Sequence, residues 1–168
     1  MKRKLWVVMV ILVAAGVALA VGGCKKASPD DAETQALARQ FMEAVYVNHD
    51  PALAMSLVVP ITAYGYVTTS VVESTVADEV NGKCSTPADS IQTGAPAGDV
   101  TIPDISTNDT AKGITARTAW MVSSTFLCTG QSKAADRTAV VFLEKVNGKW
   151  GISKVLWQTG LGPQSPAG

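Results

Sequence analysis

The sequence predicts an α+β fold in which N-terminal helices pack on a curved, cone-like antiparallel sheet, and three observations predict it. Residues 28–31, Ser-Pro-Asp-Asp, carry a strong helix-start signal ahead of a helical apolar pattern. Residues 113–128 alternate between apolar and polar side chains, as a long half-buried strand does. Residues 138–157 form two apolar runs around Asn147-Gly148, which favours a two-residue type I′ hairpin. Helices followed by antiparallel strands are typical of the α+β class.

The first predicted helix begins beside Pro29 and continues to about Val47. Ser28 is suited to the N-cap, Pro29 to the first helical position, and Asp30 to a first turn where the helix dipole favours negative charge. Apolar residues then recur at helical spacing on one face: Ala36, Leu37, Phe41, Ala44 and Val45. This face is expected to pack on the sheet.

Two shorter helices are expected next. Asp50 is suited to the N-cap of a second helix and Pro51 to its first position, and this helix is expected to end at about Leu57. A third helix is expected over 71–80, where Ser70 and Glu73 have the spacing of a capping box.

Residues 84–110 are rich in Ser, Thr, Pro, Gly and Asp, which predicts a long surface excursion with a strand-like patch at 100–105. Within it, residues 104–109, Asp-Ile-Ser-Thr-Asn-Asp, have the oxygen spacing of the first half of a calcium loop. A calcium loop needs glycine at its sixth position, where this sequence has Asp109. It also needs a bidentate glutamate at its twelfth position, where this sequence has Thr115. A polar surface turn explains these residues more simply, so no metal site is predicted.

The strand at 113–128 places Trp120, Val122 and Phe126 on one face. In the hairpin register expected around Asn147-Gly148, Leu143 faces Ile152 and Val140 faces Val155.

The first twenty-four residues have the three parts of an export signal. A basic start at 2–4 precedes an apolar run at 5–21, and Gly22-Gly23 precedes Cys24. Residues 19–24, Leu-Ala-Val-Gly-Gly-Cys, resemble the bacterial lipobox. The resemblance implies that the Cys24 thiol takes a diacylglycerol and that acyl chains such as palmitate hold the mature N-terminus in a membrane.

An uncleaved membrane anchor is the alternative for this leader, because about nineteen residues at ~1.5 Å each cross most of a ~30 Å hydrocarbon layer. Both interpretations place the residues after Cys24 on the extracytoplasmic side of the cell membrane or outer membrane. The expected organisation is a signal peptide at 1–23, a short tether at 24–29, one domain at 30–160 and a disordered tail at 161–168.

Charge disfavours a nucleic-acid partner. The leader holds three of the fourteen basic residues and none of the fourteen acidic ones, so the remainder carries about three net negative charges. Lys25-Lys26 is the basic pair beside the expected lipid, where anionic headgroups are its natural contact.

With Cys24 assigned to lipid, Cys84 and Cys128 remain in a compartment that permits disulfides, and an even remainder suggests a bridge between them. Two buried free thiols are the alternative. Zinc is poorly supported, because these cysteines and the lone His49 lack paired ligand spacing.

The helical start and the closing hairpin at 139–155, with its Asn-Gly-Lys-Trp turn, resemble the nuclear-transport-factor-two-like (cystatin-like) cone fold. Many small bacterial lipoproteins resemble it too. The resemblance spans about 30–158 and implies a fold more than a function.

Enzymes on that fold, isomerases and dehydratases, use an Asp or His base with a Tyr in an apolar pocket. Asp78, Glu79, Tyr64 and Tyr66 are candidates for such a set, but they match no motif residue by residue, and no catalytic residue or cofactor is predicted. His49 is interpreted as a helix-junction residue.

The function expected from the sequence is therefore a non-enzymatic, membrane-tethered binding or accessory module of the cell envelope, with a small apolar ligand or an envelope protein as its partner. A small-molecule enzyme on the cone fold is the alternative. Tyr64, Tyr66, Trp120 and Phe126 are the candidate pocket residues, because a twisted sheet closed by a helix tends to leave a concavity. A filled core containing these aromatics is the other possibility.

Overall fold

A computed structural model of the chain describes residues 29–60, 67–95 and 100–158. The fold below is that of the compact unit Ala32–Gly168, together with the first turn of the helix that leads into it. In the described ranges, no helix combines the length and apolar character needed to cross a bilayer. The predicted lipobox lies outside these ranges.

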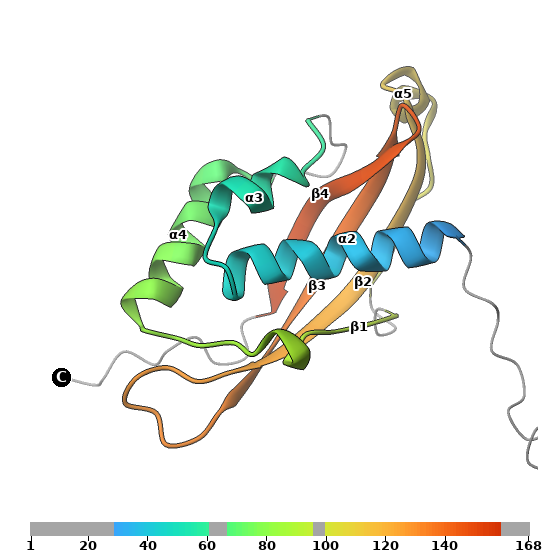
Figure 1. Cartoon of the computed structure of the whole chain (residues 1–168). Helices are drawn as coiled ribbons and strands as arrows, with labels where there is room; N and C mark the ends of the chain where they lie inside the picture. The colour runs from blue at the N-terminus through green and yellow to red at the C-terminus, as the bar shows by residue number, and fades with distance from the viewer. Residues whose placement is uncertain (1–28, 61–66, 96–99, 159–168) are drawn as a thin grey trace, which may run out of the picture. The chain divides into compact units, whose positions relative to one another are not determined.

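The unit is an α+β mix, as the sequence predicts (Figure 1). Its helices precede and interrupt a four-stranded antiparallel sheet of order β1-β2-β3-β4. The elements are α2 (Pro29–Tyr46), α3 (Pro51–Ser56), α4 (Thr69–Asn81), the short 3-10 helix η1 (Ala88–Ser90), β1 (Gln92–Gly94), α5 (Thr107–Ala111), β2 (Ile114–Phe126), β3 (Ala135–Val146) and β4 (Lys149–Gln158).

Short-range capping explains most helix boundaries. Asp50 accepts a hydrogen bond from the Leu53 backbone amide at 2.9 Å and so caps α3, as predicted. For α4 the N-cap is Thr68, not Ser70, because the Thr68 hydroxyl accepts from the Val71 amide. His49 lies at the junction between α2 and α3, with a positive φ of 51°.

The β3–β4 hairpin confirms the predicted turn. Asn147 and Gly148 have φ values of 50° and 82°, the positive pair that a type I′ turn requires. Leu143 pairs with Ile152 as expected, but a register shift between Phe142 and Leu143 makes Val140 pair with Leu156. The predicted Val140–Val155 pairing is wrong, because a bulge adds one residue to one strand only.

The expected strand at 100–105 is also absent from the structure. The segment instead contributes Val100 to a small cluster with Ala119, Val140 and Phe142. The excursion forms regular structure elsewhere, in η1, β1 and α5. The preference of a segment for strand structure depends on a partner edge being in reach.

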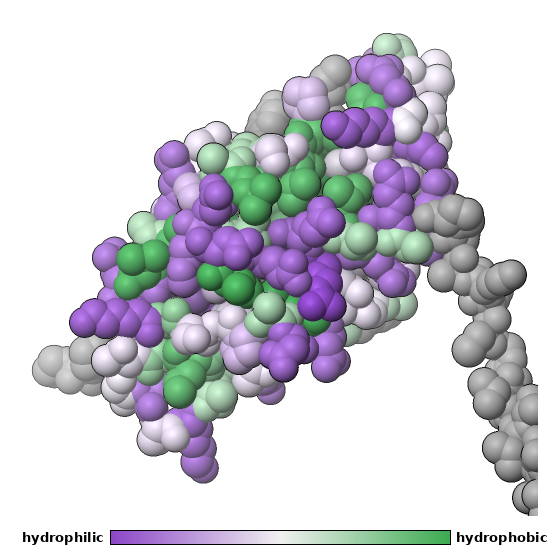
Figure 2. Space-filling view, in the orientation of Figure 1, coloured by the Kyte–Doolittle hydropathy of each residue, from purple (hydrophilic) through white to green (hydrophobic). Residues whose placement is uncertain are grey.

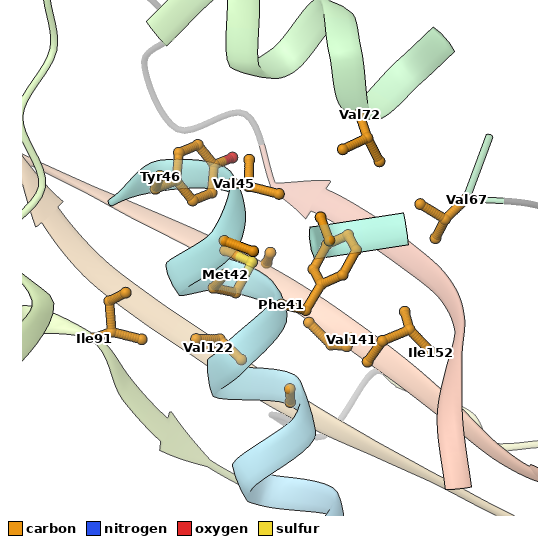
Figure 3. Packing of buried hydrophobic residues seen from close by; sticks show 14 of the residues in the cluster. Phe41, Met42, Val45, Tyr46, Val67, Val72, Ile91, Val122, Val141 and Ile152 are labelled. Carbon is orange, nitrogen blue, oxygen red and sulfur yellow. The ribbon is translucent and has the colours of Figure 1, made fainter. Parts of the chain in front are cut away.

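The main core lies between α2 and one face of the sheet. Figure 3 shows Phe41, Met42 and Val45 of α2 beside Val122 of β2 and Val141 of β3, and all five side chains are at most 1% exposed. Burying such side chains contributes about 1.5 to 3 kcal/mol each. The apolar face predicted for the first helix is therefore its packing face.

The sulfur atoms of Cys84 and Cys128 lie at disulfide distance from each other. The pair joins the residues after α4 to the residues after β2, and Ser85 and Leu127 form an antiparallel bridge beside it. A crosslink over 44 residues stabilises a fold by about 4 kcal/mol on the chain-entropy model. The predicted pairing of Cys84, at the start of the excursion, with Cys128 is thus confirmed.

Candidate binding cleft

A cleft of about 240 Å³ lies where the residues after α3 meet the β3–β4 hairpin. We call it the hairpin cleft. Most of its lining side chains are apolar, and its residues are Leu37, Ser56, Leu57, Val58, Val59, Pro60, Val146, Asn147, Lys149, Trp150 and Gly151. Apolar concavities with a few polar groups are the usual sites for small ligands.

Backbone pairing builds one wall of the cleft. Val58 forms a parallel bridge with Ile152 of β4. The Val59 amide donates to the Ile152 carbonyl at 2.9 Å, and the Ile152 amide donates to the Leu57 carbonyl at 2.8 Å. Residues 57–59 thus extend the sheet beyond β4, and their position is set by the sheet ladder.

Gly151 allows this close approach. A Cβ atom placed on Gly151 would lie 2.6 Å from Val59 Cγ1 and 3.0 Å from the Leu57 carbonyl oxygen. Real side chains almost never make such contacts, so this position needs a residue without Cβ. The glycine therefore holds the cleft wall against β4.

Trp150 contributes a buried indole to the cleft lining. Its side chain is 5% exposed, and its indole Nε1 is buried with no hydrogen-bond partner in the described part of the chain. Burying an amide or indole N–H without an acceptor costs free energy, so a native structure usually supplies one.

The cleft lining carries one positive charge and no carboxylate. Lys149 is the charged residue of the lining, and it takes part in none of the ion pairs found among the described residues. The Ser56 hydroxyl donates to the Leu53 carbonyl at 2.7 Å, so its proton is already used.

Two of the four sequence-predicted pocket residues, Trp120 and Phe126, are described by the structure, and neither lines the hairpin cleft. The Trp120 indole Nε1 donates to the Thr34 hydroxyl of α2 at 3.0 Å, which ties β2 to the helix. Phe126 is 5% exposed, and the centre of its ring lies 3.9 Å from the guanidinium carbon of Arg137. Tyr64 and Tyr66 fall outside the described residues, so the four-residue pocket stays a prediction.

Glu79, one of the acids considered for catalysis, belongs to an ion pair. Arg137 of β3 donates to both Glu79 carboxylate oxygens, at 2.8 and 3.0 Å. The guanidinium also lies 4.0 Å from the centre of the Tyr46 ring, and burial raises the pKa of Tyr46 to about 12 despite the nearby Arg137 charge. This cluster joins α2 and α4 to the sheet, while Asp78 is exposed on α4.

A second buried ion network lies on the other sheet face. Arg117 of β2 pairs with Glu144 of β3 at 2.9 Å and with Asp109 at 3.0 Å. Burial by itself lowers the pKa of Arg117, but hydrogen bonds and charges from both acids outweigh it and raise that pKa. Hydrogen bonds from the Ser106 amide and hydroxyl, aided by Arg117, hold the pKa of Asp109 below its usual value.

The structure also explains the calcium-like spacing at 104–109. Ser106 is the N-cap of α5, and Asp109 closes a capping box with it. No group of three or more His, Cys, Asp or Glu suited to a metal ion occurs in the described ranges.

Other surface features are less enclosed. A polar groove of about 350 Å³ crosses the ends of β1, β2 and β3, lined by Ser90, Gln92, Ser123, Ser124, Thr125, Asp136 and Thr138. Figure 2 shows hydrophobic and hydrophilic residues interspersed on the face that carries α2. The hairpin cleft is thus the candidate site with an apolar lining.

Sequence reasoning did not identify this cleft. The available signal was Trp150 directly after the predicted Asn-Gly turn, but nothing in the sequence linked it to residues 56–60. Compared with known proteins, the chain matches no family model, no curated protein and no solved structure.

Proposed function

We propose that the protein is a membrane-tethered, extracytoplasmic lipoprotein whose α+β domain acts as a non-enzymatic binding module and takes a small apolar ligand in the hairpin cleft. The observation that carries this proposal is the cleft itself, with its mostly apolar walls. Its volume of about 240 Å³ lies just below the range of about 300 to 1,000 Å³ that is usual for ligand pockets, which suits a small ligand.

The roles of the buried acids support a binding module over an enzyme. Glu144 and Asp109 are paired with Arg117, and Glu79 is paired with Arg137. Each ion pair connects two different helices or strands and so stabilises the fold. None of these three acids lines the hairpin cleft.

The finer fold assignment belongs to the same proposal. Helix α2 packs on one sheet face, and residues 57–59 extend the sheet at β4. Both features suit a curved, cone-like sheet of the nuclear-transport-factor-two-like kind. An export leader ending at Cys24 and the Cys84–Cys128 pair support an extracytoplasmic location.

Titration with a neutral apolar probe tests the binding function. The full chain, labelled with 5-fluorotryptophan and held in a non-ionic detergent, is titrated with 3-phenylpropanol by calorimetry and fluorine NMR. We expect saturable binding and a shift of the Trp150 fluorine signal, because the indole lines the cleft. Trp150→Phe identifies that signal by removing it.

A matched pair of serine variants locates the site. Ser56 lines the cleft and is exposed, so Ser56→Phe adds a ring at the cleft and should reduce binding at least tenfold (about 1.4 kcal/mol). Ser74→Phe, at an exposed position of α4, should bind like the parent. Equal binding by the two variants, or no saturable binding by the parent, contradicts the proposal.

A further inference from the structure

The polar groove at the ends of β1, β2 and β3 lies mainly on the sheet face away from α2. Val122 of β2 is fully buried in the main core beside α2 (Figure 3), and successive side chains of a strand point to opposite faces. Ser123 and Thr125 therefore point away from α2. Ser124, which lies between them, points to the α2 side, so its buried hydroxyl is not offered to a ligand in the groove.

The register of the sheet brings five polar side chains of the groove together on that face. Ser123 pairs with Gln92 of β1 and with Thr138 of β3. Two residues further along β2, Thr125 pairs with Asp136 of β3. Cross-strand partners share a face, with Cβ atoms about 4.5 to 5.5 Å apart, and residues two apart on a strand are about 6.8 Å apart. The five side chains thus form two adjacent rows.

These five side chains are available to a ligand. Gln92 and Asp136 are exposed, and the three hydroxyl residues are half-buried. None of the five side chains has a hydrogen bond or an ion pair with another residue in the described part of the chain. The hydroxyls and the amide both donate and accept hydrogen bonds, whereas a carboxylate only accepts them. Ser90 differs from the five, because its hydroxyl donates to the Pro87 carbonyl at 2.7 Å.

The charge and polarity of the lining disfavour three classes of ligand. An anion finds no cation in the lining and faces the Asp136 carboxylate. A calcium ion takes six to eight oxygen ligands, usually with several carboxylates, and this lining supplies a single carboxylate. An apolar ligand would remove water from these polar groups without replacing its hydrogen bonds, which costs free energy.

We infer that the polar groove binds a neutral sugar, with sugar hydroxyls donating to the Asp136 carboxylate and exchanging hydrogen bonds with the Gln92 amide and the strand hydroxyls. A sugar carries several neighbouring hydroxyl groups that each donate and accept, so it matches a lining with both kinds of group. Its hydrogen bonds to a carboxylate are stronger than those between neutral groups. The groove volume of about 350 Å³ lies within the range of about 300 to 1,000 Å³ that is usual for ligand pockets.

This site is separate from the hairpin cleft, because the two share no lining residue. The inference therefore goes beyond the proposed function and does not depend on it. One extracytoplasmic domain would then bind an apolar ligand at the hairpin and a sugar at the opposite end of β3.

Two matched pairs of probes test the class of ligand. The full chain, in a polyoxyethylene detergent that carries no sugar, is titrated at pH 7 by ligand-observed NMR. The neutral probes are methyl glucoside and methyl galactoside, and their anionic counterparts are methyl glucuronide and methyl galacturonide. We expect saturable binding of at least one neutral glycoside, and binding of its anionic counterpart about fivefold weaker or less, because its carboxylate faces Asp136. Failure of both neutral probes, or equal affinity within a pair, overturns the inference.

An acid-to-amide pair of variants assigns the binding to the groove. Asp136→Asn should lower the affinity for the bound glycoside about fivefold and narrow its advantage over the anionic counterpart, because the charge is lost. Asp136 is exposed, so this substitution of similar size leaves the fold intact. Asp78→Asn, at an exposed position of α4 outside the groove, is the matched control and should bind like the parent. Parental affinity in Asp136→Asn overturns the inference.

A second variant tests the groove from β1. Gln92→Ala should weaken binding of the glycoside about threefold, since an exposed amide is lost, and Gln40→Ala on α2 should not. Ser56→Phe, which alters the hairpin cleft, should keep the parental affinity for the glycoside. Loss of glycoside binding in Ser56→Phe would place the sugar in the hairpin cleft and so overturn the inference. Binding of 3-phenylpropanol by Asp136→Asn at the parental affinity keeps the two proposals distinct.

Discussion

Gly151 is the residue on which the local geometry of the cleft depends. It lies in β4 directly against Leu57 and Val59, closer than any side chain allows. The contact is long-range in sequence, so the need for glycine here is a tertiary one. Turn chemistry, which explains Gly148, does not explain Gly151.

Gly151→Ala should destabilise the domain by about 1 to 3 kcal/mol, because the new methyl group must displace residues 57–59 from the sheet. Urea unfolding of the full chain, followed by circular dichroism, measures this change. Gly94→Ala in β1 is the matched control, since a Cβ there meets nothing within 4 Å. If Gly151→Ala has the same urea midpoint as the parent, residues 57–59 accommodate the methyl group without loss of stability, and the prediction is wrong.

Helix α4 shows how one side chain fixes an element. Val72 and Val76 of this helix pack in the main core. Near the C-terminal end of the helix, both carboxylate oxygens of Glu79 accept hydrogen bonds from Arg137. The two side chains of this ion pair are 11% and 13% exposed. Because the Arg137 guanidinium is largely removed from water, it depends on its carboxylate partner.

Glu79→Gln should therefore cost about 2 to 4 kcal/mol of unfolding free energy, since it leaves a mostly buried guanidinium without its counter-charge. Amide hydrogen exchange should also speed up along α4. The control is Glu43→Gln in α2, which removes the partner of the more exposed Arg39 and should change stability by at most about 0.5 kcal/mol. Similar effects of the two substitutions would rule out the special role given to the buried pair.

At the scale of the whole molecule, we propose that the leader tethers the domain to a membrane. Acyl chains contribute about 0.8 kcal/mol per buried methylene, so two or three chains hold a domain at a membrane durably. The chain after the leader is formally acidic, and the basic pair Lys25-Lys26 lies in the expected tether, close to the expected lipid.

Cys24→Ala should abolish incorporation of radiolabelled palmitate and release the exported chain from the membrane fraction. The physical reason is that the thiol is the expected acceptor of the diacylglycerol. Metabolic labelling and fractionation measure both effects, with Cys128→Ala as a cysteine control that should stay labelled. Retention of label and membrane association by Cys24→Ala would favour the uncleaved-anchor alternative.

The sequence alone determined the features that depend on neighbours along the chain. Helix α3 follows from Asp50-Pro51, whose capping bond spans three residues. The β3–β4 turn follows from Asn147-Gly148, because only a few residue pairs accept two positive φ values. The α+β class and the Cys84–Cys128 pairing follow from the order of patterns and from an even remainder of cysteines.

Only the tertiary structure decided the features that join distant segments. The bulge beside Phe142 changed the hairpin register beyond the turn, and Asp109 took part in a helix cap and an ion pair. The hairpin cleft brings Trp150 to residues about ninety positions earlier in the chain. Local patterns carry no information on such contacts, because the folded chain sets these distances by packing whole elements against each other.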